Sequence, residues 1–153
     1  MSKDARHKGF ELANSKLPPF PLFSNASSSL KPLPSSKFFL TLSLGSYGTL
    51  RASVMGYEDR TPSADELDKM KNLAGECLDA GALGLSTGLV YSPGTYSRTD
   101  ELISIAEEVS KRNKLYSTHQ RDEGNDSVGL YVSLNEAIEI GRRAECKVQV
   151  SHV

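Results

Sequence analysis

The chain has 153 residues, of which 38% are hydrophobic and 24% charged, and its formal net charge is −1. This composition is typical of an ordinary globular protein, and the near-neutral charge argues against a nucleic-acid partner, because phosphate binding needs a basic surface. Two cysteines, Cys77 and Cys146, form no disulfide framework and suit a reducing compartment. No apolar run approaches the roughly 20 residues that span a bilayer. We therefore expect a cytoplasmic protein with neither a nucleic-acid nor a membrane partner.

Residues 1–36 differ in composition from the rest of the chain. Five of the seven prolines lie in this segment, together with a run of three serines. Proline removes backbone donors and serine competes for them, so no helical or strand periodicity develops here. We expect a poorly ordered leader over residues 1–36 and a single folded domain over residues 37–153.

The first elements of this domain follow from local patterns. Residues 38–44 predict a strand, since aromatic and apolar side chains are bounded there by serine and glycine. Ser63 then opens a helix as its N-cap, and Glu66 completes a capping box three residues later. Apolar residues recur at helical spacing over residues 67–78, and Gly81 supplies the left-handed residue that ends many helices.

Strands and helices alternate through the remainder of the chain. Residues 82–87, 115–119 and 147–152 predict three further strands. A helix begins at Thr99 between the first two of these, with acidic residues in its first turn. The last helix is expected over residues 127–144, and its predicted buried residues are Leu130, Leu134, Ala137, Ile138 and Gly141.

The predicted strands are each about one βα unit apart, as a parallel sheet with crossover helices requires. This alternation fits either a doubly wound sheet or part of an eight-stranded barrel. Val153 follows the final strand directly, with no helix to cover it, although a parallel sheet needs both faces covered. We therefore expect a piece of a longer α/β protein.

Two histidines lie where chemistry is expected in such a sheet. His119 and His152 each fall at the carboxyl end of a predicted strand, the edge at which barrel enzymes place their functional side chains. Imidazole is a common ligand of transition metals. Two ligands do not complete a zinc site, which needs at least three. Spacing alone thus leaves open both a metal site and a pair of hydrogen-bonded histidines.

Several longer stretches follow one another in an order shared with a known family. They are Gly48-Thr49-Leu50-Arg51, Gly81-Ala82-Leu83-Gly84-Leu85-Ser86-Thr87-Gly88-Leu89, Tyr91-Ser92-Pro93-Gly94, Thr99-Asp100-Glu101-Leu102 and Thr118-His119-Gln120-Arg121-Asp122-Glu123-Gly124. Through them, residues 47–153 resemble the N-acyl-D-amino-acid deacylases, or D-aminoacylases, of the metal-dependent amidohydrolase superfamily.

The resemblance implies a fold and a reaction. The fold is a partial (β/α)8 barrel of the amidohydrolase type, with about four parallel strands and crossover helices over residues 37–153, and the implied cofactor is Zn²⁺. The reaction is hydrolysis of the amide bond of N-acyl-D-amino acids to a carboxylate and a D-amino acid, with a metal-bound water as the nucleophile.

The resemblance also implies roles for individual residues. His119 and His152 correspond to metal ligands of the family, and the positions of Tyr91 and Val90 to contacts with the substrate. Arg121 and Glu123 are expected to form a charge-assisted pair that orients the loop behind His119.

Departures from the family pattern bear on activity. The paired histidines and the metal-binding cysteine expected upstream of His119 have no counterpart, nor does the proton-shuttling aspartate expected after His152. Tyr47 stands where the family usually has histidine, and Gln120 where it has methionine. We therefore assign no catalytic residue within this chain and expect an inactive fragment of a zinc-dependent deacylase. The alternative is a non-catalytic remnant that serves as an interaction or oligomerisation module through its open sheet edges.

Overall fold

The computed structural model describes residues 43–153. The leader expected over residues 1–36 lies outside the described residues, as does most of the strand expected over residues 38–44. The last two residues of that predicted strand are exposed and precede the first strand observed, Gly45–Ser46. In the described part of the chain, the first strand thus lies later than predicted.

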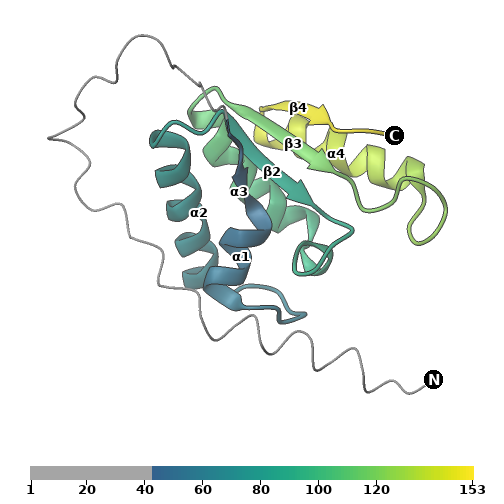
Figure 1. Ribbon diagram of the computed structural model, residues 1–153, viewed down its shortest axis with the longest axis horizontal. Coiled ribbons are helices and arrows are strands. Elements are labelled where there is room, and N and C mark those ends of the chain that lie inside the picture. Colours follow the sequence, from purple (N-terminus) through teal and green to yellow (C-terminus); the bar gives the residue numbers. More distant parts are fainter. Residues whose placement is uncertain (1–42) are drawn as a thin grey trace, which may run out of the picture. The chain divides into compact units, whose positions relative to one another are not determined.

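Four parallel strands form one sheet (Figure 1). They are β1 (Gly45–Ser46), β2 (Gly84–Gly88), β3 (Leu115–His119) and β4 (Lys147–Val150). Their order in the sheet, β1-β2-β3-β4, is their order in the chain. A doubly wound sheet reverses its strand order at a switch point, whereas a barrel does not. The sheet therefore has the topology of a barrel.

The helices lie along one side of this sheet (Figure 1). They are α1 (Tyr47–Met55), α2 (Ala64–Asp79), α3 (Thr99–Lys111) and α4 (Leu130–Ala144), with a short 3₁₀ helix, η1 (Gly94–Tyr96), before α3. Each α-helix packs against the next one along the chain, and all four also pack on the strands. This arrangement confirms the expected partial (β/α)8 barrel. Within residues 43–153, no helix has the length and apolar character needed to cross a membrane.

The two faces of the sheet differ in polarity. Leu85 and Tyr116 are buried in the core that the strands share with the helices. Because successive side chains of a strand point to opposite faces, Ser86 and Ser117 lie on the other face. Register pairing continues their row across all four strands, through Ser46, Ser86, Ser117 and Gln149. The face without helices is therefore polar.

Helix α2 forms as its sequence predicts. The Ser63 hydroxyl accepts the Glu66 N–H, and the Glu66 carboxylate accepts the Ser63 N–H, which completes the expected capping box. Met70, Ala74 and Leu78 are buried at helical spacing. These three side chains form the stripe that packs α2 onto the rest of the domain.

Helix α4 buries part of the face predicted for it: Ala137 is buried, and Leu130, Leu134 and Gly141 are half-buried. It begins at Leu130 rather than near residue 127, and Ile138 is 65% exposed. The buried residues of the helix are Ser133, Ala137, Ile140 and Ala144. Gly141 is half-buried against β4, where a Cβ atom would lie 2.5 Å from the side chain of Val148. Apolar periodicity thus places Ile138 incorrectly, and it misses Ser133, Ile140 and Ala144.

Helix α1 forms where the apolar pattern predicts none. Ser46 is its N-cap, and its buried residues are Tyr47, Arg51 and Met55. The Arg51 guanidinium donates from Nε to Glu101 of α3 over 3.0 Å. The Tyr47 hydroxyl donates to the same carboxylate. A buried polar network thus positions a helix whose sequence carries little amphipathic signal.

Candidate metal centre

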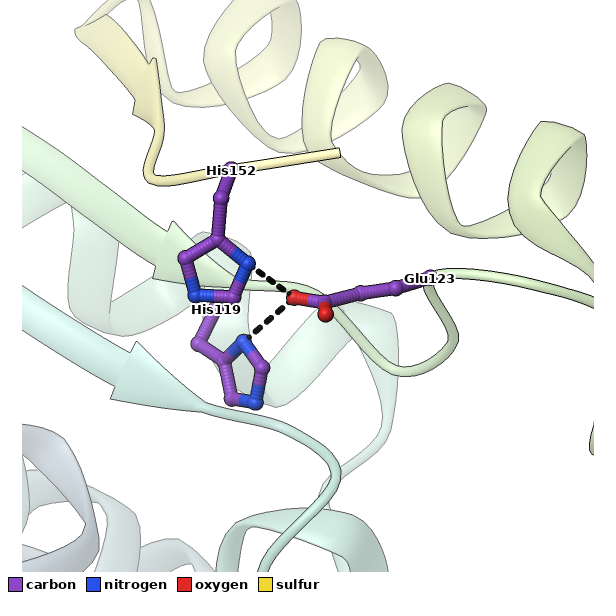
Figure 2. A group of neighbouring side chains, drawn as sticks. All are labelled: His119, Glu123 and His152. Atoms are coloured by element: carbon purple, nitrogen blue, oxygen red, sulfur yellow. Dashed lines mark ion pairs between the residues drawn. The ribbon is translucent and has the colours of Figure 1, made fainter.

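Three side chains converge at the carboxyl ends of β3 and β4 (Figure 2). His119 is the last residue of β3, Glu123 lies in the loop that follows, and His152 lies two residues beyond β4. Glu123 Oε1 is 2.7 Å from Nδ1 of His119 and also contacts Nδ1 of His152. One ligand atom from each residue lies within 4.8 Å of the other two. The structure therefore brings together the two histidines predicted at adjacent strand ends.

The aromatic surroundings hold the His119 ring in place. Its centroid lies 4.6 Å from that of His152 and 5.1 Å from that of Tyr91, and both partner rings are tilted. Tyr91 itself is 65% exposed and Val90 is 46% exposed. Tyr91 therefore lies beside His119, and both Tyr91 and Val90 have side-chain surface free for a further contact.

The donor chemistry of this cluster fits a divalent metal ion. Nδ1 of His119 is shielded from solvent and has no hydrogen-bond partner in the described part of the chain. Its short distance to Glu123 is thus a close approach without the direction of a hydrogen bond. A buried polar atom without a partner is unfavourable unless something else satisfies it. Two imidazoles and one carboxylate form a ligand set that catalytic zinc uses.

The loop that carries Glu123 is held by Asp122. The Asp122 carboxylate accepts backbone N–H groups from Gly124, Ser127 and Gly129 over 2.9, 2.7 and 2.8 Å. These hydrogen bonds lower the pKa of the Asp122 carboxyl to about 2. Its own N–H donates to the Ser133 hydroxyl of α4. The carboxylate therefore acts as a local anchor that fixes the backbone on the C-terminal side of Glu123.

The expected pair between Arg121 and Glu123 does not form. Arg121 instead donates to the Glu136 carboxylate of α4, over 2.7 Å from Nε and 3.1 Å from one terminal nitrogen. It also donates to the carbonyls of Thr95 and Ser97, which join η1 to the loop after β3. Glu123 is drawn to the imidazoles, so the guanidinium finds its carboxylate on the neighbouring helix. Sequence proximity suggested the wrong partner.

Two cavities open beside the cluster. The first cavity has a volume of about 440 Å³ and lies beside His119 and the loop that follows it. Its lining residues are Val90, Tyr91, His119, Gln120, Arg121, Asp122, Glu123, Gly124, Asp126 and Ser127. The second, about 470 Å³, lies over the carboxyl ends of β1 and β2. Tyr91 lines both of them. The residues that line the second cavity include Ser46, Thr49, Ser86, Thr87 and Ser92.

The cysteines lie away from this cluster. Cys77, in α2, and Cys146, just before β4, are partly buried and pack against the hydrophobic core. Burial raises the pKa of the Cys146 thiol. Both thiols therefore occupy packing positions in the described fold, and the metal-ligating groups that converge are imidazoles and a carboxylate.

Comparison with known proteins relates this fold to metal-dependent enzymes. No family model matches the chain. The D-aminoacylase of Alcaligenes xylosoxydans xylosoxydans is 38% identical over 106 residues, which are 69% of this chain and 21% of that protein. The N-acyl-D-aspartate deacylase of the same organism is 39% identical over 105 residues, or 68% and 20% of the two chains.

A solved structure agrees with these sequence matches. The N-acyl-D-glutamate deacylase of Bordetella bronchiseptica, determined with zinc and a phosphonate inhibitor, superposes with a TM-score of 0.60 at 32% identity. The match covers 66% of this chain and 21% of that structure. A sequential parallel sheet with histidines at its strand ends thus represents a part of an amidohydrolase barrel. The chain is thus similar to a segment of N-acyl-D-amino-acid deacylases and spans about one fifth of the length of these relatives.

Proposed function

We propose that this chain belongs to an enzyme that hydrolyses the amide bond of N-acyl-D-amino acids, releasing a carboxylate and a D-amino acid. The proposal includes one Zn²⁺ ion held through His119 and His152. The observation that carries it is the convergence of these two imidazoles on one point at adjacent strand ends. The similarity to three deacylases of this substrate class, at 34–39% identity, supports it independently.

The choice of zinc rests on ligand chemistry and on a related structure. Imidazole nitrogen and carboxylate oxygen are ligands that zinc accepts. The related N-acyl-D-glutamate deacylase was determined with zinc, and a further D-aminoacylase structure concerns a binuclear metal centre. When bound, zinc polarises an amide carbonyl and lowers the pKa of its water toward neutrality.

The residues around the cluster have separate roles in this proposal. Val90 and Tyr91 form the wall of the first cavity nearest His119, where the acyl or side-chain part of a substrate would contact them. Arg121 uses its donors on Glu136 and on two backbone carbonyls. It is therefore a positioning residue that holds the loop after β3 against η1, and its charge is not directed at the substrate.

The proposed setting is the cytoplasm, because two unpaired cysteines suit a reducing compartment. The proposed partner is a small molecule, since the near-neutral charge argues against nucleic acid. Self-association of the chain is also proposed. In the described part of the chain, β1 and β4 are the edges of the sheet, and unpaired edges favour pairing with another copy. On α4, Tyr131, Val132 and Ile138 add exposed apolar surface.

The function can be tested in a chimera. The 106-residue segment of the Alcaligenes D-aminoacylase that matches this chain is replaced by the corresponding residues of the chain. The chimera should bind zinc and release D-amino acid from N-acetyl-D-amino acids. His119→Ala and His152→Ala should each remove both properties, whereas Lys147→Ala, at the opposite end of β4, should leave both unchanged. Stoichiometric zinc in either histidine variant, or a folded zinc-bound chimera without turnover, would contradict the proposal.

A further inference from the structure

We infer that Glu136 of α4 is a positioning residue for the substrate wall of the proposed enzyme. Its carboxylate, acting through Arg121 and Thr99, holds the turn that carries Tyr91 against the end of β3. The inference deepens the proposed function and rests on it, because Tyr91 is assigned there to the substrate. Glu136 itself lines neither of the two cavities. Its effect is therefore exerted through the residues that it holds.

The carboxylate of Glu136 is engaged by two side chains. Its Oε2 accepts the Nε–H of Arg121 over 2.7 Å, and its Oε1 accepts an Nη2–H of the same guanidinium over 3.1 Å. Oε1 also accepts the hydroxyl of Thr99, the first residue of α3, over 2.8 Å. The side chains of Arg121 and Glu136 are 17% and 10% exposed. A two-point contact of this kind, largely shielded from water, fixes the guanidinium in one orientation.

The guanidinium of Arg121 directs its other donors at the backbone that leads from β2 to α3. Nη1 donates to the carbonyl of Thr95 over 3.0 Å, and Nη2 donates to the carbonyl of Ser97. The N–H of Thr95 in turn donates to the carbonyl of Tyr91 over 2.8 Å. Arg121 therefore holds the residue that closes the turn beginning at Tyr91.

The same turn places Tyr91 beside His119. The N–H of Leu89, two residues before Tyr91, donates to the carbonyl of His119 over 2.9 Å, so the near end of the segment is attached to β3. The centroids of the Tyr91 and His119 rings lie 5.1 Å apart. Because the Tyr91 side chain is largely exposed, its own packing gives it little support. Its position therefore depends on the backbone at both ends of the turn, and Arg121 and Glu136 hold the far end.

The packing of α3 on α4 has a separate, apolar basis. Val109 of α3 and Ile140 of α4 are completely buried in the same hydrophobic core. Glu136 instead faces the first turn of α3, where it accepts the Thr99 hydroxyl. Loss of the Glu136 carboxylate is therefore expected to loosen the turn that carries Tyr91 while the two helices stay packed.

The test follows the ring protons of His119 by NMR in the full 153-residue chain, with a chelator present so that no metal contributes. The resonances are assigned by comparison with His119→Gln. A neighbouring aromatic ring shifts them, and Tyr91→Leu measures the change that follows when that ring is removed.

Four further variants address the contacts of Glu136. Glu136→Gln removes the charge, and Thr99→Val removes the hydroxyl donor while keeping the shape of the side chain. Thr99→Ser keeps the donor. Glu139→Gln is the matched control, since Glu139 lies on the same helix in a more exposed ion pair.

Glu136→Gln should move the His119 resonances in the same direction as Tyr91→Leu does. Thr99→Val should move them less, whereas Thr99→Ser and Glu139→Gln should leave them unchanged. Unmoved resonances in Glu136→Gln would overturn the inference, and Thr99→Val decides alone if Glu136→Gln does not fold. An equal movement in Glu139→Gln, or none in Tyr91→Leu, would overturn it as well.

A second measurement separates this inference from the proposed function. In the chimera described above, Glu136→Gln should raise KM about 10-fold with little change in kcat, since a displaced wall weakens the binding of substrate and transition state alike. Glu139→Gln should change neither constant, and a fall in kcat with KM unchanged would contradict the role. A folded, zinc-bound chimera without turnover would refute the proposed function. The NMR shifts would still decide whether Glu136 positions Tyr91, so the two failures are distinguishable.

Discussion

The guanidinium of Arg51 in α1 forms an ion pair with the carboxylate of Glu101 in α3, with 3.0 Å between Nε and Oε1, and both side chains are almost completely buried. The same guanidinium donates to the carbonyls of Glu58 and Arg60 in the loop after α1. Burial and the nearby carboxylate raise the pKa of the Tyr47 hydroxyl, which stays a donor to Glu101. One buried pair thus connects two helices and a loop.

Arg51→Met should lower the free energy of unfolding by about 3–5 kcal/mol, because it leaves a buried carboxylate without its counter-charge. Urea denaturation followed by circular dichroism measures this loss. The control is Arg143→Met, since Arg143 pairs with Asp100 and Glu139 at the surface, where exposed pairs contribute less than about 1 kcal/mol. Equal losses in the two variants would contradict the importance of the buried pair.

Gln120→Met should stabilise the fold. Gln120 is 1% exposed, and neither polar atom of its side chain has a hydrogen-bond partner in residues 43–153. Methionine has a similar length and no such requirement, so the free energy of unfolding should rise by about 1–3 kcal/mol. Gln149→Met, on exposed β4, should change it by less than about 0.5 kcal/mol. Destabilisation by Gln120→Met in thermal or urea unfolding would argue against this interpretation.

Glu66 should make stability depend on acid pH. Hydrogen bonds from Arg60 and from the Ser63 N–H lower the pKa of its carboxyl to about 2. The unfolded value is about 4.3, so the carboxylate stabilises the fold above about pH 4.3, and this contribution is lost as the pH falls toward about 2. The stability difference between the unmodified chain and Glu66→Gln should therefore shrink over that range. Urea unfolding at successive pH values measures it, and a constant difference would be inconsistent with the lowered pKa.

The 153-residue chain alone should not hydrolyse N-acyl-D-amino acids. Its described sheet has four strands, whereas a closed barrel of this type has eight. The His152 side chain is 55% exposed, so water reaches the cluster freely instead of being excluded. The purified chain is assayed with zinc at protein excess. Turnover that follows the chain through gel filtration and disappears in His119→Ala would show the prediction to be wrong.

Local signals account for the elements that the sequence predicts well. The bounds of β3 match, because Leu115–His119 is a short segment between two helical patterns. The start of α2 matches because Ser63 and Glu66 need only each other. The buried face of α4 and the existence of α1 depend on distant partners, such as Val148 on β4 for the first and Glu101 on α3 for the second. Periodicity contains no information about them.

The same distinction applies to the candidate site. His119 and His152 could be placed together because the carboxyl ends of adjacent parallel strands share one edge. The direction of Glu123 could not be predicted, since it depends on how Asp122 folds the following loop. The His119–Glu123 spacing of four residues was the one available signal. Arg121 found its partner on α4, and a charge pattern read along the chain favours the nearer carboxylate instead.

The pairing of Arg121 with Glu136 leaves the first cavity with a surplus of negative charge. Three carboxylates line it, from Asp122, Glu123 and Asp126, against one guanidinium that is already neutralised from outside. An anionic molecule such as an N-acyl amino acid is repelled by that potential, whereas a divalent cation is attracted. We therefore expect a cation to be needed in this cavity before an anionic molecule can bind there.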